Sequence, residues 1–161
     1  MKQKILSQIK DSKFSKFVFK ANQVNPIEHL KTATANVPNN DGNYYVFANA
    51  DKELPEHLIF NILNNDYELI YFGISGGVSK SGKVGLQKLK DRINNVVGSS
   101  SIKRAKYWDS EMKIYNINEF TVFYCINNNP KEIEDYIYEF LKSEKLNYPK
   151  LNKKRGRKKK S

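Results

Sequence analysis

The 161-residue chain carries 28 Lys and Arg against 17 Asp and Glu, a net charge of +11, and 39% of its residues are hydrophobic. This length fits one domain, and the apolar fraction supports a core, which excludes wholesale disorder. One cysteine excludes an intramolecular disulfide, and no apolar run reaches the roughly 18 residues of a membrane helix, so we expect a soluble protein of the cytoplasm with no membrane partner.

Residues 1–41 are polar and of mixed pattern, and we interpret them as an N-terminal extension. Ile5, Leu6 and Ile9 predict a short helix, and a second is expected near Pro26, since proline favours the first turn of a helix. Buried anchors are expected at three aromatic residues: Phe14, Phe17 and Phe19.

Beyond the turn cluster that ends at Gly42, the chain becomes rich in strand-forming residues. Segment 54–63 mixes Pro55 with an apolar run, and its pattern is ambiguous. Three other segments of aromatic and β-branched residues predict strands, over about 43–49, 67–75 and 120–126.

Two helices are predicted from apolar residues at helical spacing. The first follows a Gly-, Ser- and Lys-rich loop over 76–85, and its apolar face holds Leu86, Leu89, Ile93, Val96 and Val97. The second begins at Pro130, and its apolar face holds Ile133, Tyr136, Ile137, Phe140 and Leu141. The order of these elements predicts one small α+β domain over 42–152, followed by a basic disordered tail over 153–161.

Most of the positive charge lies near the C-terminus. Residues 150–161 hold eight basic residues and no acidic one, so the rest of the chain carries only +3. Arg155 and Arg157 flank Gly156. An Arg-Gly-Arg sequence of this kind can lie in the narrow minor groove of A·T-rich DNA. A solubilising polyelectrolyte tail is the alternative interpretation.

A second basic segment runs over 80–106 with a net charge of +7, and Asp91 is its one acid. Such a local field attracts polyphosphate, whereas a solvated helix face normally intersperses acids with its lysines. Together with the two tail arginines, the predicted nucleic-acid contacts in this segment are Lys80, Lys83, Lys88, Lys103 and Arg104.

The loop at 77–84 has nearly the spacing of a phosphate-binding P-loop. Val84 stands where that motif needs a Ser or Thr to hold Mg²⁺, and no later strand ends in the required Asp. We therefore exclude nucleotide hydrolysis, although the glycines and lysines of this loop can still contact a nucleic-acid phosphate.

Polar residues at the ends of the predicted elements form an ordered set. The set comprises Gly42-Asn43-Tyr44 at the first strand, Tyr71-Phe72-Gly73 at the second, Arg92 and Glu134 on the two helices, and Asn152 in Pro149-Lys150-Leu151-Asn152. In this order, over about 42–152, the chain resembles the GIY-YIG nuclease superfamily.

The resemblance implies a small three-stranded antiparallel sheet flanked by helices and a DNA endonuclease dependent on Mg²⁺, or on another divalent cation such as Mn²⁺. Tyr44 and Tyr71 would flank the attacking water, one of them as general base or its hydrogen-bonding partner. Arg92 would bind the scissile phosphate, Glu134 would ligate the metal, and Asn152 would order the site. These five side chains are then expected to converge in one cleft.

The chemistry of the reaction agrees with these residue types. Hydrolysis of a charged phosphodiester needs cations at the phosphate oxygens and an activated water. Mg²⁺ prefers oxygen ligands and keeps several waters, so one carboxylate can suffice. Arg92 offers a planar donor fork suited to phosphate. A phenol acting as base needs a nearby cation, for which Lys83 and the metal are the candidates.

Helical geometry selects the carboxylate on the second helix. At about 100° per residue, Glu134 lies at the edge of the apolar face, whereas Glu139 points away and Asp135 is almost opposite. Each of the five residues taken alone also has a simpler interpretation as an ordinary strand, surface or turn residue.

The chain departs from the family pattern at several places. Asn43 and Phe72 replace aliphatic residues, residues 50–66 would be an insertion, and Val96 and Val97 stand where many members have a histidine or tyrosine. The alternatives to a nuclease are a catalytically inactive nucleic-acid-binding protein of the same fold and a solvated domain with an incidental tail.

Overall fold

The computed structural model describes residues 1–50, 53–78, 81–85, 87–94 and 103–152. The strands are β1 (Lys16–Lys20), β2 (Gly42–Asn49), β3 (Ile59–Ile62), β4 (Asn65–Ser75) and β5 (Glu119–Ile126). The helices are α1 (Lys2–Asp11), α2 (Pro26–Ala33), α3 (Leu89–Asn94), α4 (Lys103–Ile114) and α5 (Pro130–Ser143), with a 3₁₀ turn, η1 (Glu56–Leu58). Within the described part of the chain, no helix is both long and apolar enough to cross a membrane.

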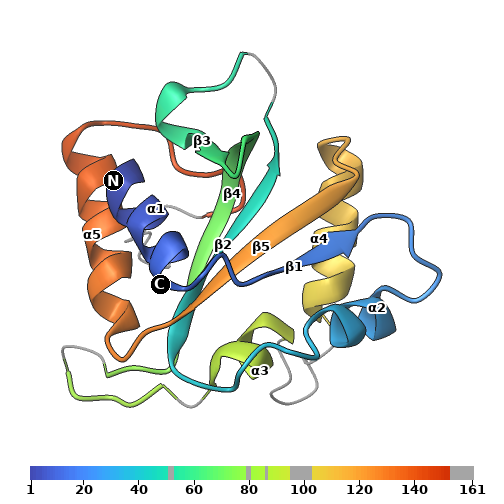
Figure 1. The fold of residues 1–161 in the computed structure, drawn as a ribbon, viewed down its shortest axis with the longest axis horizontal. Helices are drawn as coiled ribbons and strands as arrows, with labels where there is room; N and C mark the ends of the chain where they lie inside the picture. The colour runs from blue at the N-terminus through green and yellow to red at the C-terminus, as the bar shows by residue number, and fades with distance from the viewer. Residues whose placement is uncertain (51–52, 79–80, 86, 95–102, 153–161) are drawn as a thin grey trace, which may run out of the picture.

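The five strands form one antiparallel sheet in the order β1-β5-β2-β4-β3 (Figure 1). The α+β class agrees with the sequence, but the predicted three-stranded sheet is wrong. The three predicted strands are its centre, β5-β2-β4, and an edge strand is added on each side.

Both additional strands are short, which explains why the pattern did not reveal them. β1 has five residues, of which Phe17 and Phe19 are buried. In the sequence these two residues indicate only isolated buried aromatic side chains and not a strand. β3 has four residues and lies in the ambiguous segment after Pro55, paired to the start of β4. Edge strands of this length carry too few alternations to give a period.

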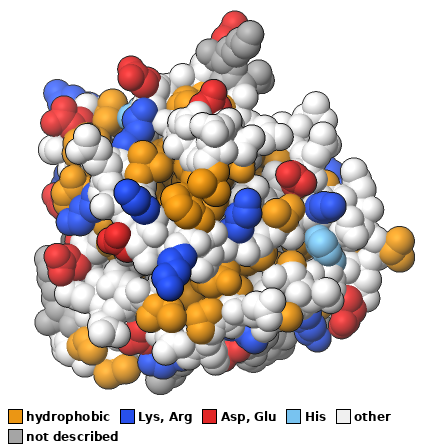
Figure 2. Space-filling model, in the orientation of Figure 1, with side chains coloured by type: hydrophobic (Ala, Val, Ile, Leu, Met, Phe, Trp, Pro, Cys, Tyr) orange, Lys and Arg blue, Asp and Glu red, His pale blue; other side chains and the backbone are white. Residues whose placement is uncertain are grey.

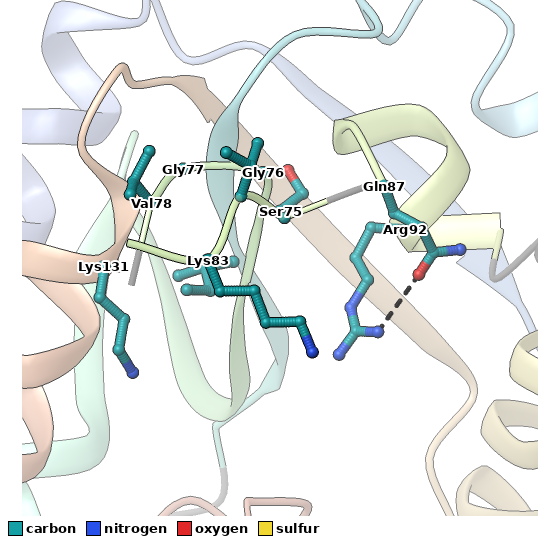
Figure 3. Close-up of a pocket in the computed structure, with 11 residues that line it drawn as sticks. Ser75, Gly76, Gly77, Val78, Lys83, Gln87, Arg92 and Lys131 are labelled. Carbon is teal, nitrogen blue, oxygen red and sulfur yellow. Dashed lines mark hydrogen bonds between the residues drawn. The ribbon is translucent and has the colours of Figure 1, made fainter. Parts of the chain in front are cut away.

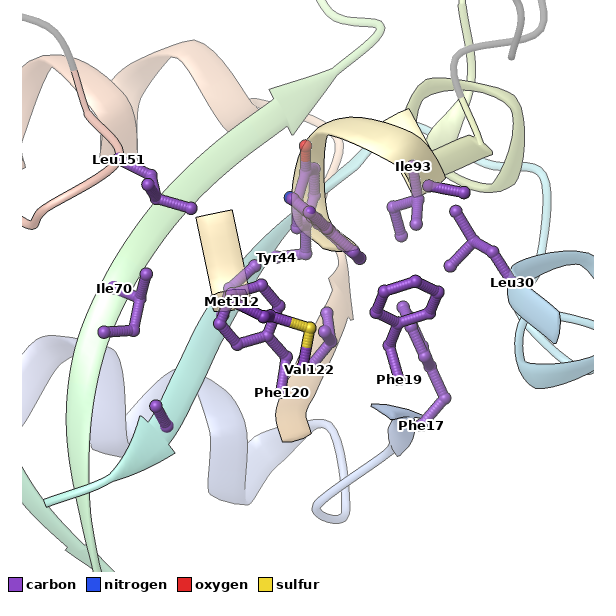
Figure 4. Packing of buried hydrophobic residues seen from close by; sticks show 14 of the residues in the cluster. Phe17, Phe19, Leu30, Tyr44, Ile70, Ile93, Met112, Phe120, Val122 and Leu151 are labelled. Atoms are coloured by element: carbon purple, nitrogen blue, oxygen red, sulfur yellow. The ribbon is translucent and has the colours of Figure 1, made fainter. Parts of the chain in front are cut away.

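Helices cover both faces of the sheet (Figure 1). Buried residues of α2, α3 and α4 pack on one face in a core that includes Leu30, Ile93 and Met112 (Figure 4). Residues of α1 and α5, among them Ile9 and Ile137, pack on the other face. The result is a three-layer arrangement in which the sheet is buried between two helical layers.

Helix α4 was not predicted. Its buried residues are Ala105, Trp108 and Met112, at spacings of three and four, while most of its other residues are polar and Ile114 at its end is exposed. Of the predicted face of α3, Leu89 and Ile93 are buried, and Leu86, Val96 and Val97 lie outside the described residues.

The residues before Gly42 belong to the same two cores as the rest of the chain. Ile5 is fully buried, and Phe19 packs with its ring centre 5.6 Å from that of Trp108. β1 pairs with β5 over its whole length. Segment 1–41 therefore supplies a strand and two helices to the packed structure.

Phe19→Ala is expected to lower the free energy of unfolding by about 3–5 kcal/mol, because the ring is fully buried between two layers. Urea unfolding followed by the fluorescence of Trp108, the chain's single tryptophan, measures the loss. Val24→Ala, at a fully exposed position of the same segment, is the control and should change it by less than about 0.5 kcal/mol. Equal values for the two variants would contradict the packing of β1 described above.

Candidate active site at the open edge of strand β4

The outer edge of β4 is covered in two stages. β3 pairs with the first part of the strand, up to Glu68. Farther along, the C-terminal segment takes its place: the Leu151 amide donates to the Ile70 carbonyl (3.0 Å), and the Asn152 side chain binds the backbone of Phe72. The part of the edge at Gly73 and Ile74 lines a cavity instead.

This cavity has a volume of about 670 Å³ and lies between the two helical layers. α5 forms one wall, and α3 and α4 form the other. Four of the five predicted site residues line it, together with the predicted DNA contact Arg104. The full lining is Tyr71, Phe72, Gly73, Ile74, Arg92, Arg104, Tyr107, Glu111, Glu134, Tyr138, Leu151 and Asn152.

Tyr44, the fifth predicted residue, lies behind the cavity and does not line it. Its ring is fully buried, 5.9 Å from the ring of Tyr71 between centres. Gly73 pairs with Tyr44 across β2 and β4, and a Cβ at Gly73 would come within 2.6 Å of the Tyr44 ring. Because it has no side chain, Gly73 leaves room for the ring of Tyr44.

Gly42 likewise allows β2 to lie close to β5. A Cβ at Gly42 would collide with the Cys125 carbonyl oxygen on β5. A larger residue would push β2 away from β5 and disturb the register that aligns Gly73 with Tyr44.

The two tyrosines have different environments. Burial raises the pKa of Tyr44, the nearby Tyr71 adds to this, and the charges of Arg104 and Arg92 oppose it. Tyr44 is therefore protonated at neutral pH. Tyr71 is partly exposed and lines the cavity, so of the two phenols it is the one that can contact a water there.

Two guanidinium groups contribute positive charge to the cavity. Arg92 is exposed, and its Nη1 donates to Gln87 Oε1 at 3.3 Å. Arg104 is half-buried, with its guanidinium carbon 5.7 Å from the ring centres of both Tyr71 and Trp108. Burial acts to lower the pKa of Arg104, but the phenols of Tyr44 and Tyr71 outweigh it and the pKa is raised. The cation beside Tyr71 is therefore Arg104.

Two carboxylates line the same cavity from opposite walls. Glu134 on α5 pairs with Lys131 Nζ at 2.6 Å, and Glu111 extends from α4. Among the described residues, no cluster of three or more His, Cys, Asp and Glu side chains could hold a metal. One or two carboxylates with retained waters are, however, the usual protein contribution to a Mg²⁺ site, so the oxygen donors present fit this ion.

Sequence reasoning missed Tyr107 and Glu111 because it missed α4. In that helix Arg104, Tyr107 and Glu111 follow at spacings of three and four and therefore share one face. The sequence feature that could have revealed α4 is the helical spacing of Ala105, Trp108 and Met112. This pattern predicts a helix, but it contains only three residues.

The other predicted DNA contacts are placed as follows. Lys83 lines a second cavity, and Lys88 Nζ pairs with Asp41 Oδ1 at 2.5 Å. Lys103 begins α4, and its side chain lies outside the described part, as do Lys80, Arg155 and Arg157. On the face shown in Figure 2, Lys and Arg side chains are spread among other residues rather than gathered in one block.

The loop after β4 differs from a P-loop in shape. Val78 and Val84 pair as a β-bridge, and the Gly85 amide donates to the Gly77 carbonyl at 2.9 Å. The loop thus folds on itself, and α3 begins only at Leu89. It does not lead directly into a helix, as a nucleotide-binding loop does.

Both departures within the triplets have a packing partner. Asn43 is buried and exchanges two amide hydrogen bonds with Gln8 of α1, at 2.8 and 2.7 Å. Phe72 packs on Tyr138 of α5 with ring centres 4.9 Å apart. Each substitution thus fits a neighbouring helix on the α1–α5 face and leaves the cavity-lining residues in place.

Neither the protein-family models, nor the curated proteins, nor the solved structures with which the chain was compared give a match. What the cavity can do is therefore inferred from its own side chains.

Asn152→Ala is expected to destabilise the fold by about 1–3 kcal/mol, because it removes two bonds to the Phe72 backbone and one to the Tyr138 hydroxyl. Asn152→Asp keeps the acceptor but sets a carboxylate oxygen against the Phe72 carbonyl oxygen, so it should destabilise the fold at least as much as Ala. Thermal unfolding measures the loss. Asn147→Ala, at an exposed position of the same segment, is the control, and an equal effect there would refute the role given to Asn152.

Tyr44→Phe should change the free energy of unfolding at neutral pH by less than about 1 kcal/mol, because it keeps the buried ring and removes only the hydroxyl. The raised pKa of Tyr44 stabilises the fold fully below the unfolded value of about 10, and this is lost as pH rises above it. Urea unfolding between about pH 8 and pH 11 should therefore show that the free energy of unfolding falls less with rising pH in the variant than in wild type. Parallel curves would contradict the burial of this phenol.

Proposed function

We propose that the chain is a divalent-metal-dependent DNA endonuclease of the GIY-YIG type. The supporting observation is the lining of one cavity by Tyr71, Arg92, Glu134 and Asn152, which come from four separate segments. Arg104 and Glu111 add a second cation and a second carboxylate to the same cavity. This combination of charges is what phosphodiester hydrolysis needs.

In the proposed reaction a water oxygen forms a bond to phosphorus as the water's proton passes to Tyr71 or to solvent. The bond from phosphorus to the leaving sugar oxygen breaks, and that oxygen takes up a proton from solvent. Arg92 binds the non-bridging oxygens with its planar donor fork, and Arg104 adds charge from the α4 wall. Glu134, with Glu111 opposite, would hold Mg²⁺ or Mn²⁺, which supplies positive charge where negative charge develops.

The tyrosines take different parts in this proposal. Tyr71 lines the cavity and orients the attacking water or receives its proton, while Arg104 lies over its ring. Tyr44 is buried and protonated, and it supports Tyr71 by packing against it. Asn152 is a positioning residue, because its bonds hold the backbone of Phe72, next to Tyr71.

The proposed partner is DNA, and the proposed location is the cytoplasm. The net charge of +11 favours a polyanion, and counterion release makes such binding strongly dependent on salt. Cys125 is a buried free thiol, which suits a reducing compartment.

A catalytically inactive nucleic-acid-binding protein is the second candidate function. The observation that favours it is the ion pair between Lys131 and Glu134, which satisfies the carboxylate without a metal. The two candidates differ in one measurable property, cleavage in the presence of a divalent cation.

Glu134→Gln is expected to reduce Mg²⁺-dependent nicking of supercoiled plasmid by roughly 10²-fold or more, because a neutral amide binds the cation poorly. Binding of DNA should persist in the variant, as measured by fluorescence anisotropy without metal. Glu139→Gln, an exposed position on the same helix, is the matched control and should cleave like wild type.

Cleavage that is insensitive to Glu134→Gln would refute the site. Binding of DNA without cleavage, across Mg²⁺, Mn²⁺ and single- and double-stranded substrates, would favour the inactive binding protein instead.

A further inference from the structure

A second cavity adjoins the first one along β4. It has a volume of about 500 Å³, and most of its lining comes from the loop after that strand (Figure 3). Ile74 and Arg92 line both cavities. The two cavities therefore meet at Arg92.

The charged side chains of this cavity are all positive. Its lining contains Lys83 from the loop, Arg92 from α3 and Lys131 from the first turn of α5, and it contains no Asp or Glu. In Figure 3 the amino end of Lys83 and the guanidinium of Arg92 point toward the same part of the cavity. Lys131 Nζ is paired with Glu134 and Asp135 of its own helix, so an anion seated there would meet Lys83 and Arg92, which come from two separate segments. Two cations at one place favour phosphate over a neutral ligand.

The lining also includes apolar side chains, those of Ile74, Val78 and Val84. Val78 and Val84 form the bridge in the loop, and each is 57% exposed. Isolated exposed valines need no explanation, but these two are paired and stand beside the cations. A nucleotide offers both matching surfaces, since its phosphate is charged and its deoxyribose is largely hydrocarbon.

We propose that this cavity binds the nucleotide adjoining the scissile phosphate on the same DNA strand. Its phosphate contacts Lys83 on the side of the cavity that Arg92 also faces, and its sugar covers Val78 and Val84. The inference rests on the proposed function, because Arg92 connects this cavity to the site of cleavage. Gln87 is then a positioning residue, since its Oε1 accepts from Arg92 where the two cavities meet.

The test measures binding of a short DNA duplex by fluorescence anisotropy at several salt concentrations in EDTA, where no cleavage is required. Lys83→Gln should weaken binding and reduce the slope of log K against log salt by about 0.9, the value for one phosphate contact. Lys10→Gln, the same change on an exposed position of α1, should keep the wild-type slope.

A double variant tests the apolar half of the cavity. Val78→Ser combined with Val84→Ser should lower the affinity by about five- to tenfold without altering the salt slope, because apolar contacts release no counterions. Circular dichroism and thermal unfolding establish that each variant is folded before binding is compared.

The inference is overturned if Lys83→Gln has the slope of Lys10→Gln, or if the double valine variant binds like wild type. Its failure is distinct from that of the nuclease proposal. The predicted slopes without any cleavage would refute the nuclease and keep this binding site, whereas cleavage with unchanged slopes would refute the binding site and keep the nuclease.

Discussion

The contact between the Tyr44 ring and the backbone of Gly73 determines the geometry of the candidate site. β2 and β4 are adjacent here, and the ring occupies the space that any side chain at position 73 would need. Because the ring is fully buried, it provides a fixed support for Tyr71. Tyr71 lines the cavity, and it is held in place by Tyr44, which does not line it.

The cavity exists because the edge of β4 is left uncovered at one point. An unpaired strand edge is normally shortened, charged or covered. Here β3 and then Asn152 cover it up to Phe72, and beyond that the helical layers on the two faces project side chains over it. Cations and carboxylates from distant segments line the cavity at this edge for that reason.

The parts of the fold that could be predicted from sequence are those with a sustained pattern. β2, β4 and β5 are long, apolar strands, and α5 has a regular buried face beside which Glu134 lines the cavity. β1, β3 and α4 are short or polar, and tertiary packing decides their structure. The place of Arg104 in the cavity depends on α4, so the sequence indicated a basic residue there without indicating its neighbours.

The central claim is that a divalent cation and DNA meet in the cavity at the edge of β4. Paramagnetic broadening by Mn²⁺ of the protein's NMR spectrum, in the presence of a short DNA duplex, tests it directly. The account predicts that the amide signals of Gly73, Ile74 and Glu134 broaden first, while those of β3, such as Asn61, stay sharp. Broadening that begins elsewhere, or that is uniform over the protein, would contradict it.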